Sequence, residues 1–152
     1  MPWFSIAWAG FVSVIFAAAF FWVFRALRLT EFSPSIHLGC LILRNPGHPA
    51  TETTGFLLLI LLGSSVVPMI YQQLFGLAGG PSWLIGLGIG AVHGLLAAAI
   101  LPVFGTISAC IRAGALPAPG TMGTKWGWLT PFVMVLGHGL YGAVCGAILG
   151  NL

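Results

Sequence analysis

The sequence has very few charged residues. Its 152 residues include five Lys or Arg and two Asp or Glu, so charged side chains make up 5% of the chain while hydrophobic residues make up 59%. A soluble protein needs many more charges on its water-facing surface. The composition therefore argues against an ordinary soluble domain and predicts an integral membrane protein.

The sequence also lacks the motifs of common enzymes. It contains no nucleophile elbow, phosphate loop or His-Glu-x-x-His sequence. No Asp or Glu lies within the long apolar segments, which argues against a proton or sodium relay built on carboxylates. The five cations are too scattered to form a nucleic-acid interface, so we expect no nucleic-acid partner. We therefore expect a chain that is not an enzyme.

Cysteine is scarce as well. Cys40, Cys110 and Cys145 are odd in number, widely spaced and embedded in apolar or Gly/Ala-rich sequence, so neither a disulfide framework nor a zinc motif is visible. His37 and Cys40 form a His-x-x-Cys pair and His48 follows, but zinc needs four suitable ligands and the other cysteines are in other segments, which argues against a zinc site there. We expect three buried free thiols and no metal beyond that of a tetrapyrrole, which is considered below.

Four long apolar segments dominate what is present. A membrane-spanning helix needs about 20 apolar residues, and segments 3–24, 54–76, 83–104 and 127–150 meet this requirement. Open strands are excluded at that depth because lipid cannot satisfy their edge groups. The predicted fold class is an all-α integral membrane protein, with four transmembrane helices bundled into a single domain over residues 1–152.

All seven charges lie in two loops, 25–53 and 105–126. By the positive-inside rule, both loops are cytoplasmic and both termini are outside, in what we expect to be a bacterial inner membrane. Tryptophans lie near both ends of the predicted helices, as in the aromatic belts at membrane interfaces. They are Trp3, Trp8 and Trp83 at the uncharged end, and Trp22, Trp126 and Trp128 at the charged end.

The first charged loop contains the start signals of a short helix at about 33–44. Ser33 suits the N-cap and Pro34 the first helical position. Three apolar residues would share one face of that helix: Leu38, Leu41 and Ile42. The pattern predicts an amphipathic helix lying on the membrane surface. The alternative is an irregular apolar loop packed on the bundle.

Small residues recur at every fourth position in the third and fourth predicted helices. The rows contain Gly86, Gly90 and Gly94 in the third helix and Gly142 and Gly146 in the fourth. Such rows allow close backbone contact between helices in lipid. We expect the third and fourth helices to pack tightly against each other.

The second predicted helix contains Pro68, which removes a backbone hydrogen bond and should kink the helix. Tyr71, Gln72 and Gln73 follow near its outer end. These residues are either interfacial polar groups beside a structural kink or part of a substrate pathway.

His93 and His138 are the best candidates for a site. Each lies ten residues from a tryptophan near a helix end, about 15 Å below the interface at a rise of about 1.5 Å per residue. Each also begins a His-Gly-Leu tripeptide among small residues. A neutral imidazole there suits an axial ligand of one b-type haem held between the pair, or of one chlorophyll-type pigment on each. The alternatives are a hydrogen bond that pins two helices, and a contact with a substrate or quinone.

Three functional hypotheses follow. The first is a non-enzymatic accessory or scaffold subunit of a larger membrane complex, such as an electron-transfer or photosynthetic complex, because little of the chain lies outside the predicted spans. Its partners would be the lipid bilayer and other membrane subunits. The second is a tetrapyrrole-binding electron-transfer or light-harvesting subunit that uses His93 and His138. The third is a small transporter or channel.

Overall fold

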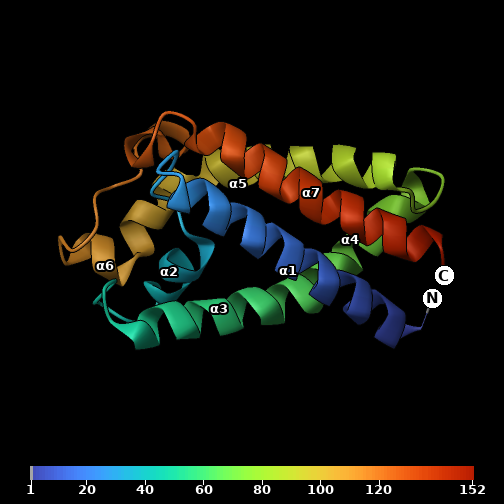
Figure 1. Cartoon of the computed structure of the whole chain (residues 1–152), viewed down its shortest axis with the longest axis horizontal. Helices are drawn as coiled ribbons and strands as arrows, with labels where there is room; N and C mark the ends of the chain where they lie inside the picture. Colours follow the sequence, from blue (N-terminus) through green and yellow to red (C-terminus); the bar gives the residue numbers. More distant parts are fainter. Residues whose placement is uncertain (1) are drawn as a thin grey trace.

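A computed structural model describes residues 2–152, which fold almost wholly as helices (Figure 1). The long helices are α1 (Trp3–Ala26), α3 (Pro49–Ser64), α4 (Val66–Leu77), α5 (Trp83–Ile107) and α7 (Thr130–Gly150). The short ones are α2 (Pro34–Gly39), α6 (Ala109–Arg112) and the 3₁₀ helix η1 (Thr121–Trp126). No strand occurs among residues 2–152.

The four predicted apolar helices are confirmed. α1, α3 together with α4, α5, and α7 are each long and apolar enough to cross a membrane. The largest difference from the predicted bounds is at the start of α3, which begins at Pro49 instead of residue 54. The His48 side chain caps this end, where its Nδ1 accepts a hydrogen bond from the Ala50 N–H at 3.1 Å. A cap and a proline thus begin the helix several polar residues before the apolar run.

The helix that contains Pro68 is broken rather than smoothly kinked. α3 and α4 are separated at Ser65, whose backbone has φ −118° and ψ −75°. Pro68 cannot donate to the carbonyl four residues earlier, which weakens the helix at this point. α1 packs onto the break: a Cβ on Gly63 would lie 2.6 Å from Val14 Cγ2, and one on Gly10 would lie 2.5 Å from Pro68 Cγ. The absence of those two Cβ atoms lets α1 lie directly against the break.

α5 and α7 lie side by side (Figure 1). The glycines of the two rows lie at this contact: Gly86, Gly90, Gly94, Gly142 and Gly146. A Cβ on Gly90 would overlap the carbonyl oxygen of His138, and one on Gly142 would overlap that of Gly86. The two backbones therefore touch, with no side chains between them.

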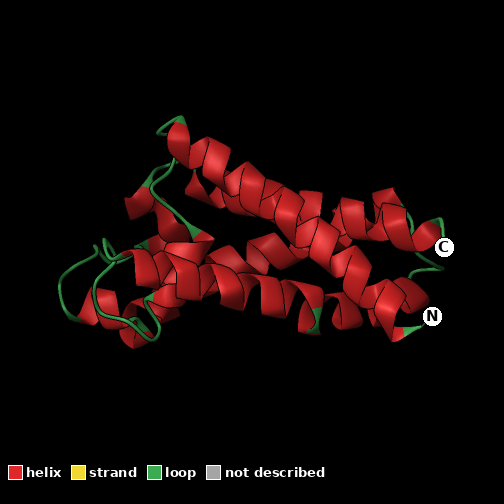
Figure 2. Ribbon diagram, turned by 60° about the horizontal axis from the view of Figure 1, so that its bottom comes forward, coloured by secondary structure: helices red, strands yellow, loops and turns green. Residues whose placement is uncertain are grey.

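The charged loops lie at one end of the long helices and both termini at the other (Figures 1 and 2). The turn between α4 and α5 lies at the end with the termini. α2 and α6 lie at the end with the charged loops. The molecule thus has one compact, uncharged end and one end built from longer connecting segments.

α2 does not lie on an outer surface, so that prediction was wrong. The helix begins where expected, at Pro34, and the Ser33 hydroxyl accepts a hydrogen bond from the backbone as the N-cap. It ends at Gly39, and three of its residues are buried: Ile36, His37 and Gly39. A Cβ on Gly55 of α3 would overlap the backbone of α2. Because two glycines allow α2 and α3 into backbone contact, α2 is packed into the molecule.

The expectation of three free thiols was also wrong. Cys40, at the end of α2, and Cys110, in α6, form a disulfide with a Cα–Cα distance of 5.3 Å. The Ala109 N–H donates to the Cys40 carbonyl at 2.7 Å, so the backbones also pair here. Only Cys145 is free and buried as expected. The bonded cysteines are 70 residues apart, and their proximity depends on packing that spacing along the chain does not reveal.

Trp126 is a core residue and does not belong to an aromatic belt. Its side chain is 2% exposed, whereas each of the other five tryptophans is more than half exposed. The indole N–H donates to the Pro117 carbonyl at 2.9 Å. The ring packs against Phe32 and His37, with centroid distances of 5.9 Å and 4.1 Å. Trp126 therefore ties the second charged loop to the first.

Candidate functional site

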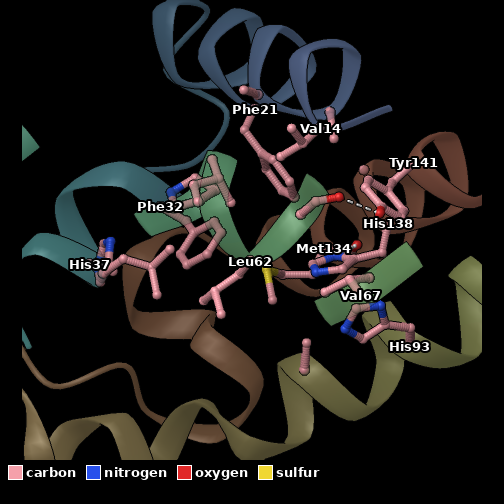
Figure 3. Close-up of a pocket in the computed structure, with 18 of the residues that line it drawn as sticks. Val14, Phe21, Phe32, His37, Leu62, Val67, His93, Met134, His138 and Tyr141 are labelled. Atoms are coloured by element: carbon pink, nitrogen blue, oxygen red, sulfur yellow. Dashed lines mark hydrogen bonds between the residues drawn. The ribbon is translucent and has the colours of Figure 1, made fainter. Parts of the chain in front are cut away.

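The helices line an apolar cavity of about 560 Å³ (Figure 3), which is open on the side where Leu62, Leu96 and Ile100 are exposed. Its walls come from α1, α2, α3, α4, α5 and α7, together with Phe32. No Lys, Arg, Asp or Glu lines it among the described residues. This volume is within the range that small-molecule ligands occupy in proteins. Figure 3 shows His37 at one end of the cavity and His93 and His138 at the other.

The two histidines singled out by the sequence are brought together. His93 on α5 and His138 on α7 have ring centroids 4.6 Å apart, with 67° between the ring planes. Both rings line the cavity. The backbone contact at Gly90 brings α5 against the carbonyl of His138 itself, so the glycine row sets the distance between the helices at this level.

His138 presents a hydrogen-bond acceptor. Its Nδ1 lies 2.8 Å from the carbonyl oxygen of Met134, one turn earlier on α7. Because a carbonyl only accepts, Nδ1 must carry the ring proton, and Nε2 keeps its lone pair. Nε2 has no protein partner among residues 2–152, and it is not one of the enclosed unpaired atoms of that region. The ring therefore offers one unused acceptor at the wall of an apolar cavity.

Tyr71 extends this group. Its hydroxyl lies 3.1 Å from Nδ1 of His93, a contact between α4 and α5. When the hydroxyl donates, the proton of the His93 ring is on Nε2, which then offers a donor beside the acceptor of His138. The Tyr141 hydroxyl donates to the Gly63 carbonyl at 2.7 Å, next to the break between α3 and α4. The broken helix thus supplies a polar contact to His93 through Tyr71 and accepts a hydrogen bond from Tyr141 of α7 at Gly63.

His37 lies at the far end of the cavity and is 5% exposed. Its Nδ1 donates to the Ser33 carbonyl at 2.7 Å, and its Nε2 is enclosed without a partner. The pKa of His37 is lowered from 6.5 to about 4, mainly by burial and to a smaller extent by the charge of Arg25, while the hydrogen bond to the Ser33 carbonyl acts in the opposite direction. His37 is therefore neutral at pH 7.

The geometry does not suit a haem held between His93 and His138. Metal–nitrogen bonds of about 2 Å on both faces of a macrocycle would place the two imidazole centroids about 6 Å apart. The observed 4.6 Å leaves the rings in direct contact. The glycine face of α5 at Gly90 offers no room for a macrocycle either, because the α7 backbone covers it.

One axial ligand is compatible with the geometry at His138. Histidines that bind a metal usually donate their other ring N–H to a carbonyl or carboxylate, which fixes the tautomer. His138 does so through Met134 and leaves Nε2 free. Among residues 2–152, no three His, Cys, Asp or Glu side chains lie close enough to hold a metal ion by themselves.

Sequence reasoning found the two central histidines but missed their surroundings. Tyr71 was noted only as a polar residue near a helix end, and Tyr141 and His37 were not assigned to the site. The one signal available for Tyr141 was its position three residues after His138, on the same side of a helix. His37 gave no comparable signal, because it reaches the cavity only through the folding of the first charged loop.

Comparisons with protein-family models, with curated proteins and with solved structures found no match to this chain.

Proposed function

We propose that this chain is an integral membrane protein, not itself an enzyme, that holds one neutral lipophilic molecule in its cavity through a hydrogen bond to His138. The observation that carries the proposal is the free Nε2 acceptor at the wall of an otherwise apolar space. A hydrogen-bond donor on the molecule would satisfy this acceptor, and an apolar body would fill the remaining volume. A charged ligand is disfavoured because no charged side chain lines the cavity.

A second candidate is a tetrapyrrole bound through His138 as a single axial ligand. The Nδ1–H bond to the Met134 carbonyl supports it, because this bond leaves Nε2 in the state that binds a metal. In that case the chain would act as an electron-transfer or light-harvesting subunit. The pigment would lie in the cavity, on the side of His138 away from His93.

The proposal includes a place within a larger membrane complex. In the span Pro49–Leu77, only 17% of the most apolar window is buried within this chain. An apolar helix surface left this open can be covered by lipid or by a neighbouring subunit. We therefore retain the hypothesis of an accessory subunit, with the bound molecule as its contribution to the complex.

The test is to purify the protein in a mild detergent and to identify what it retains by absorption spectroscopy and by mass spectrometry of an organic extract. Soret and α bands would indicate haem, far-red bands a chlorophyll-type pigment, and neither band a colourless lipophilic molecule. His138→Leu fills a similar space with an apolar side chain but removes the acceptor, and it should lower the amount of retained molecule about tenfold.

His48→Asn is the matched control, since His48 is exposed at a helix cap and outside the cavity. This variant should retain the parental amount. A parental protein that carries no molecule, or a His138→Leu variant that retains as much as the parent, would contradict the proposal.

A further inference from the structure

A second space, a groove of about 610 Å³, lies between α1 and α3. Each of these helices lines the groove with residues spaced i, i+3, i+4 and i+7, which is the spacing of one helix face. The residues are Ile15, Ala18, Ala19 and Trp22 on α1, and Pro49, Glu52, Thr53 and Phe56 on α3, together with Ser35 of α2. Ile15, Trp22 and Phe56 are 39%, 68% and 40% exposed. The groove is therefore open on the outside of the molecule.

The groove is polar at one end and apolar at the other. α1 and α3 run in opposite directions (Figure 1), so Trp22, near the end of α1, and Glu52, in the first turn of α3, both lie towards the charged loops. Ile15 lies seven residues before Trp22, about 10 Å along the helix axis at a rise of about 1.5 Å per residue. Phe56 follows Glu52 by four residues. A phospholipid in the membrane proposed above has the same order, with its polar headgroup at the interface and its apolar chains below it.

The polar end of the groove carries one charge of each sign. A small space of about 40 Å³ borders the groove, and four residues line both: Ala18, Trp22, Ser35 and Glu52. Arg25 lines this small space together with Glu52, Ser33 and Ser35. The side chains of Arg25 and Glu52 are both exposed. A headgroup that lies across Glu52 therefore meets a cation, an anion and the Ser35 hydroxyl.

This pair of opposite charges favours a headgroup that itself carries both signs. A phosphate accepts hydrogen bonds from the guanidinium of Arg25, which presents its N–H groups as a planar fork. A primary ammonium donates hydrogen bonds to the carboxylate of Glu52 and to the hydroxyl of Ser35. A quaternary ammonium has no N–H group to donate. A headgroup with only a negative charge would lie beside the Glu52 carboxylate without a cation of its own to offset the repulsion.

We propose that the groove binds one phospholipid with an ethanolamine headgroup, from the leaflet at the end of the molecule that carries the charged loops. The phosphate lies against Arg25 and the ammonium against Glu52. An acyl chain lies along the apolar part of the groove, between Ile15 and Phe56. This inference rests on the membrane location proposed above, but not on the ligand of the cavity beside His138.

The test offers delipidated protein in detergent an equimolar mixture of phosphatidylethanolamine, phosphatidylcholine and phosphatidylglycerol with identical acyl chains. Native mass spectrometry then measures which lipid is bound. The parent should prefer the ethanolamine lipid about fivefold over either competitor, the effect of one exposed ion pair. Glu52→Gln should abolish the preference over the choline lipid, because the amide no longer attracts the ammonium. Glu31→Gln removes the same charge at an exposed site that lines neither space, and it should keep the preference.

Two further variants test the acyl chain and the independence of the site. Ala19→Phe places a ring in the groove and should lower the binding of all three lipids, whereas Ala99→Phe, at an exposed site on α5 outside the groove, should not. His138→Leu should keep the headgroup preference of the parent.

The comparison of headgroups in the parent needs no variant to fold. A parent without a preference, or with a preference for either competitor, would overturn the inference, as would a preference that survives Glu52→Gln. The proposed function would still stand after such a result, because its measurement is the molecule that His138 retains in the cavity. Loss of that molecule alone, with the headgroup preference intact, would overturn the proposed function and not this inference.

Discussion

Two histidines make the same local hydrogen bond but differ in their surroundings. In both His37 and His138, Nδ1–H donates to the carbonyl four residues earlier, at 2.7 Å and 2.8 Å. Both therefore keep a lone pair on Nε2. In His37 this atom is enclosed and unpaired, with Phe32 and Trp126 packed around the ring. In His138 it is at the wall of the cavity. The surroundings, and not the residue type, decide which of the two can receive a ligand.

His37 should make the stability of the protein depend on pH. Its pKa is lowered from 6.5 to about 4 in the folded state, so the unfolded state binds more protons between these values. The contribution of the neutral His37 ring to the free energy of unfolding is then fully present above about pH 6.5, and it is lost as the pH is lowered towards 4. Because only one proton is involved, the free energy of unfolding changes by at most about 1.4 kcal/mol per pH unit.

Thermal unfolding in detergent from pH 7.5 to 4 measures this effect as the difference between the parent and His37→Phe. The substituted ring can pack between the same aromatic neighbours, and the variant should lose the part of the slope that His37 supplies. His48→Asn keeps a helix cap at an exposed site and serves as the control. Identical pH profiles for the parent and His37→Phe would show that the ring is not buried as described.

At this scale, the sequence predicted which residues to examine but not their contacts. Matched depth and a shared tripeptide indicated His93 and His138, because the depth follows from helical rise along a predicted span and the tripeptide is read directly from the sequence. A haem held between them does not fit, because the two rings are 4.6 Å apart and α7 packs directly on Gly90. The Cys40–Cys110 bond was missed because 70 residues separate the two cysteines.

The contact of α5 with α7 is the feature that determines the geometry of the site at the scale of helices. α5 supplies His93 and α7 supplies His138, and the glycines between them allow the backbones to touch. A change that separates these helices would therefore also separate the two rings. The contact can be tested within one helix, because α5 carries glycines on both its packed and its open side.

Gly90→Ala should destabilise the protein by about 1–3 kcal/mol, the usual cost of overpacking, because the new methyl group would overlap the His138 carbonyl. Gly88→Ala is the matched control: nothing lies within 4 Å of a Cβ at that position. It should be neutral, or stabilising by up to about 1 kcal/mol through helix propensity. Thermal unfolding of the two variants in the same detergent makes the comparison. Equal stabilities would place α7 elsewhere than against Gly90.

Helices were easier to predict than their ends and interruptions. The length of an apolar run is a local property, and it located four long helices. The start of α3 was missed because its first turns are polar, and hydropathy does not register a cap. The break at Ser65 and the burial of α2 depend on how α1 and α3 pack around them. Pro68 indicated a disturbance in the helix but not its position.

For the whole molecule, two features disagree about the compartment of the charged loops. The five Lys and Arg residues favour a cytoplasmic location, by the positive-inside rule. The Cys40–Cys110 bond joins these same loops, and disulfides are rare in the cytoplasm because thiols there are kept reduced. We expect the charge pattern to decide the orientation, with the pair reduced in growing cells and oxidised after isolation in air.

This expectation can be measured by quenching cells in acid and alkylating free thiols before lysis. Cys40 and Cys110 should both be found alkylated, and cysteines introduced in the turn at 78–82 should react with an impermeant reagent from outside. The parental chain without an introduced cysteine is the control. Recovery of the bonded form directly from quenched cells would contradict the proposed orientation and would place the charged loops in an oxidising compartment.

The cavity is a property of the whole molecule that no segment of the sequence predicts. Six helices and Phe32 of the first charged loop contribute walls to it. Glycine rows and apolar runs describe surfaces that can pack, whereas a cavity is the space that packing leaves. Its volume follows from how the helices diverge, which depends on every contact together.

The Cys40–Cys110 bond also makes part of the backbone a closed ring. α3, α4 and α5 all lie between the two cysteines, so a single cut in that stretch cannot release either fragment. A protease site inserted between Gly79 and Gly80, where a Cβ would meet no neighbour, allows this to be examined with oxidised protein. The severed chain should migrate as one species until a reductant is added, and then as two. A protein cut open at the end near its termini would thus remain a single covalent molecule, held together at its opposite end.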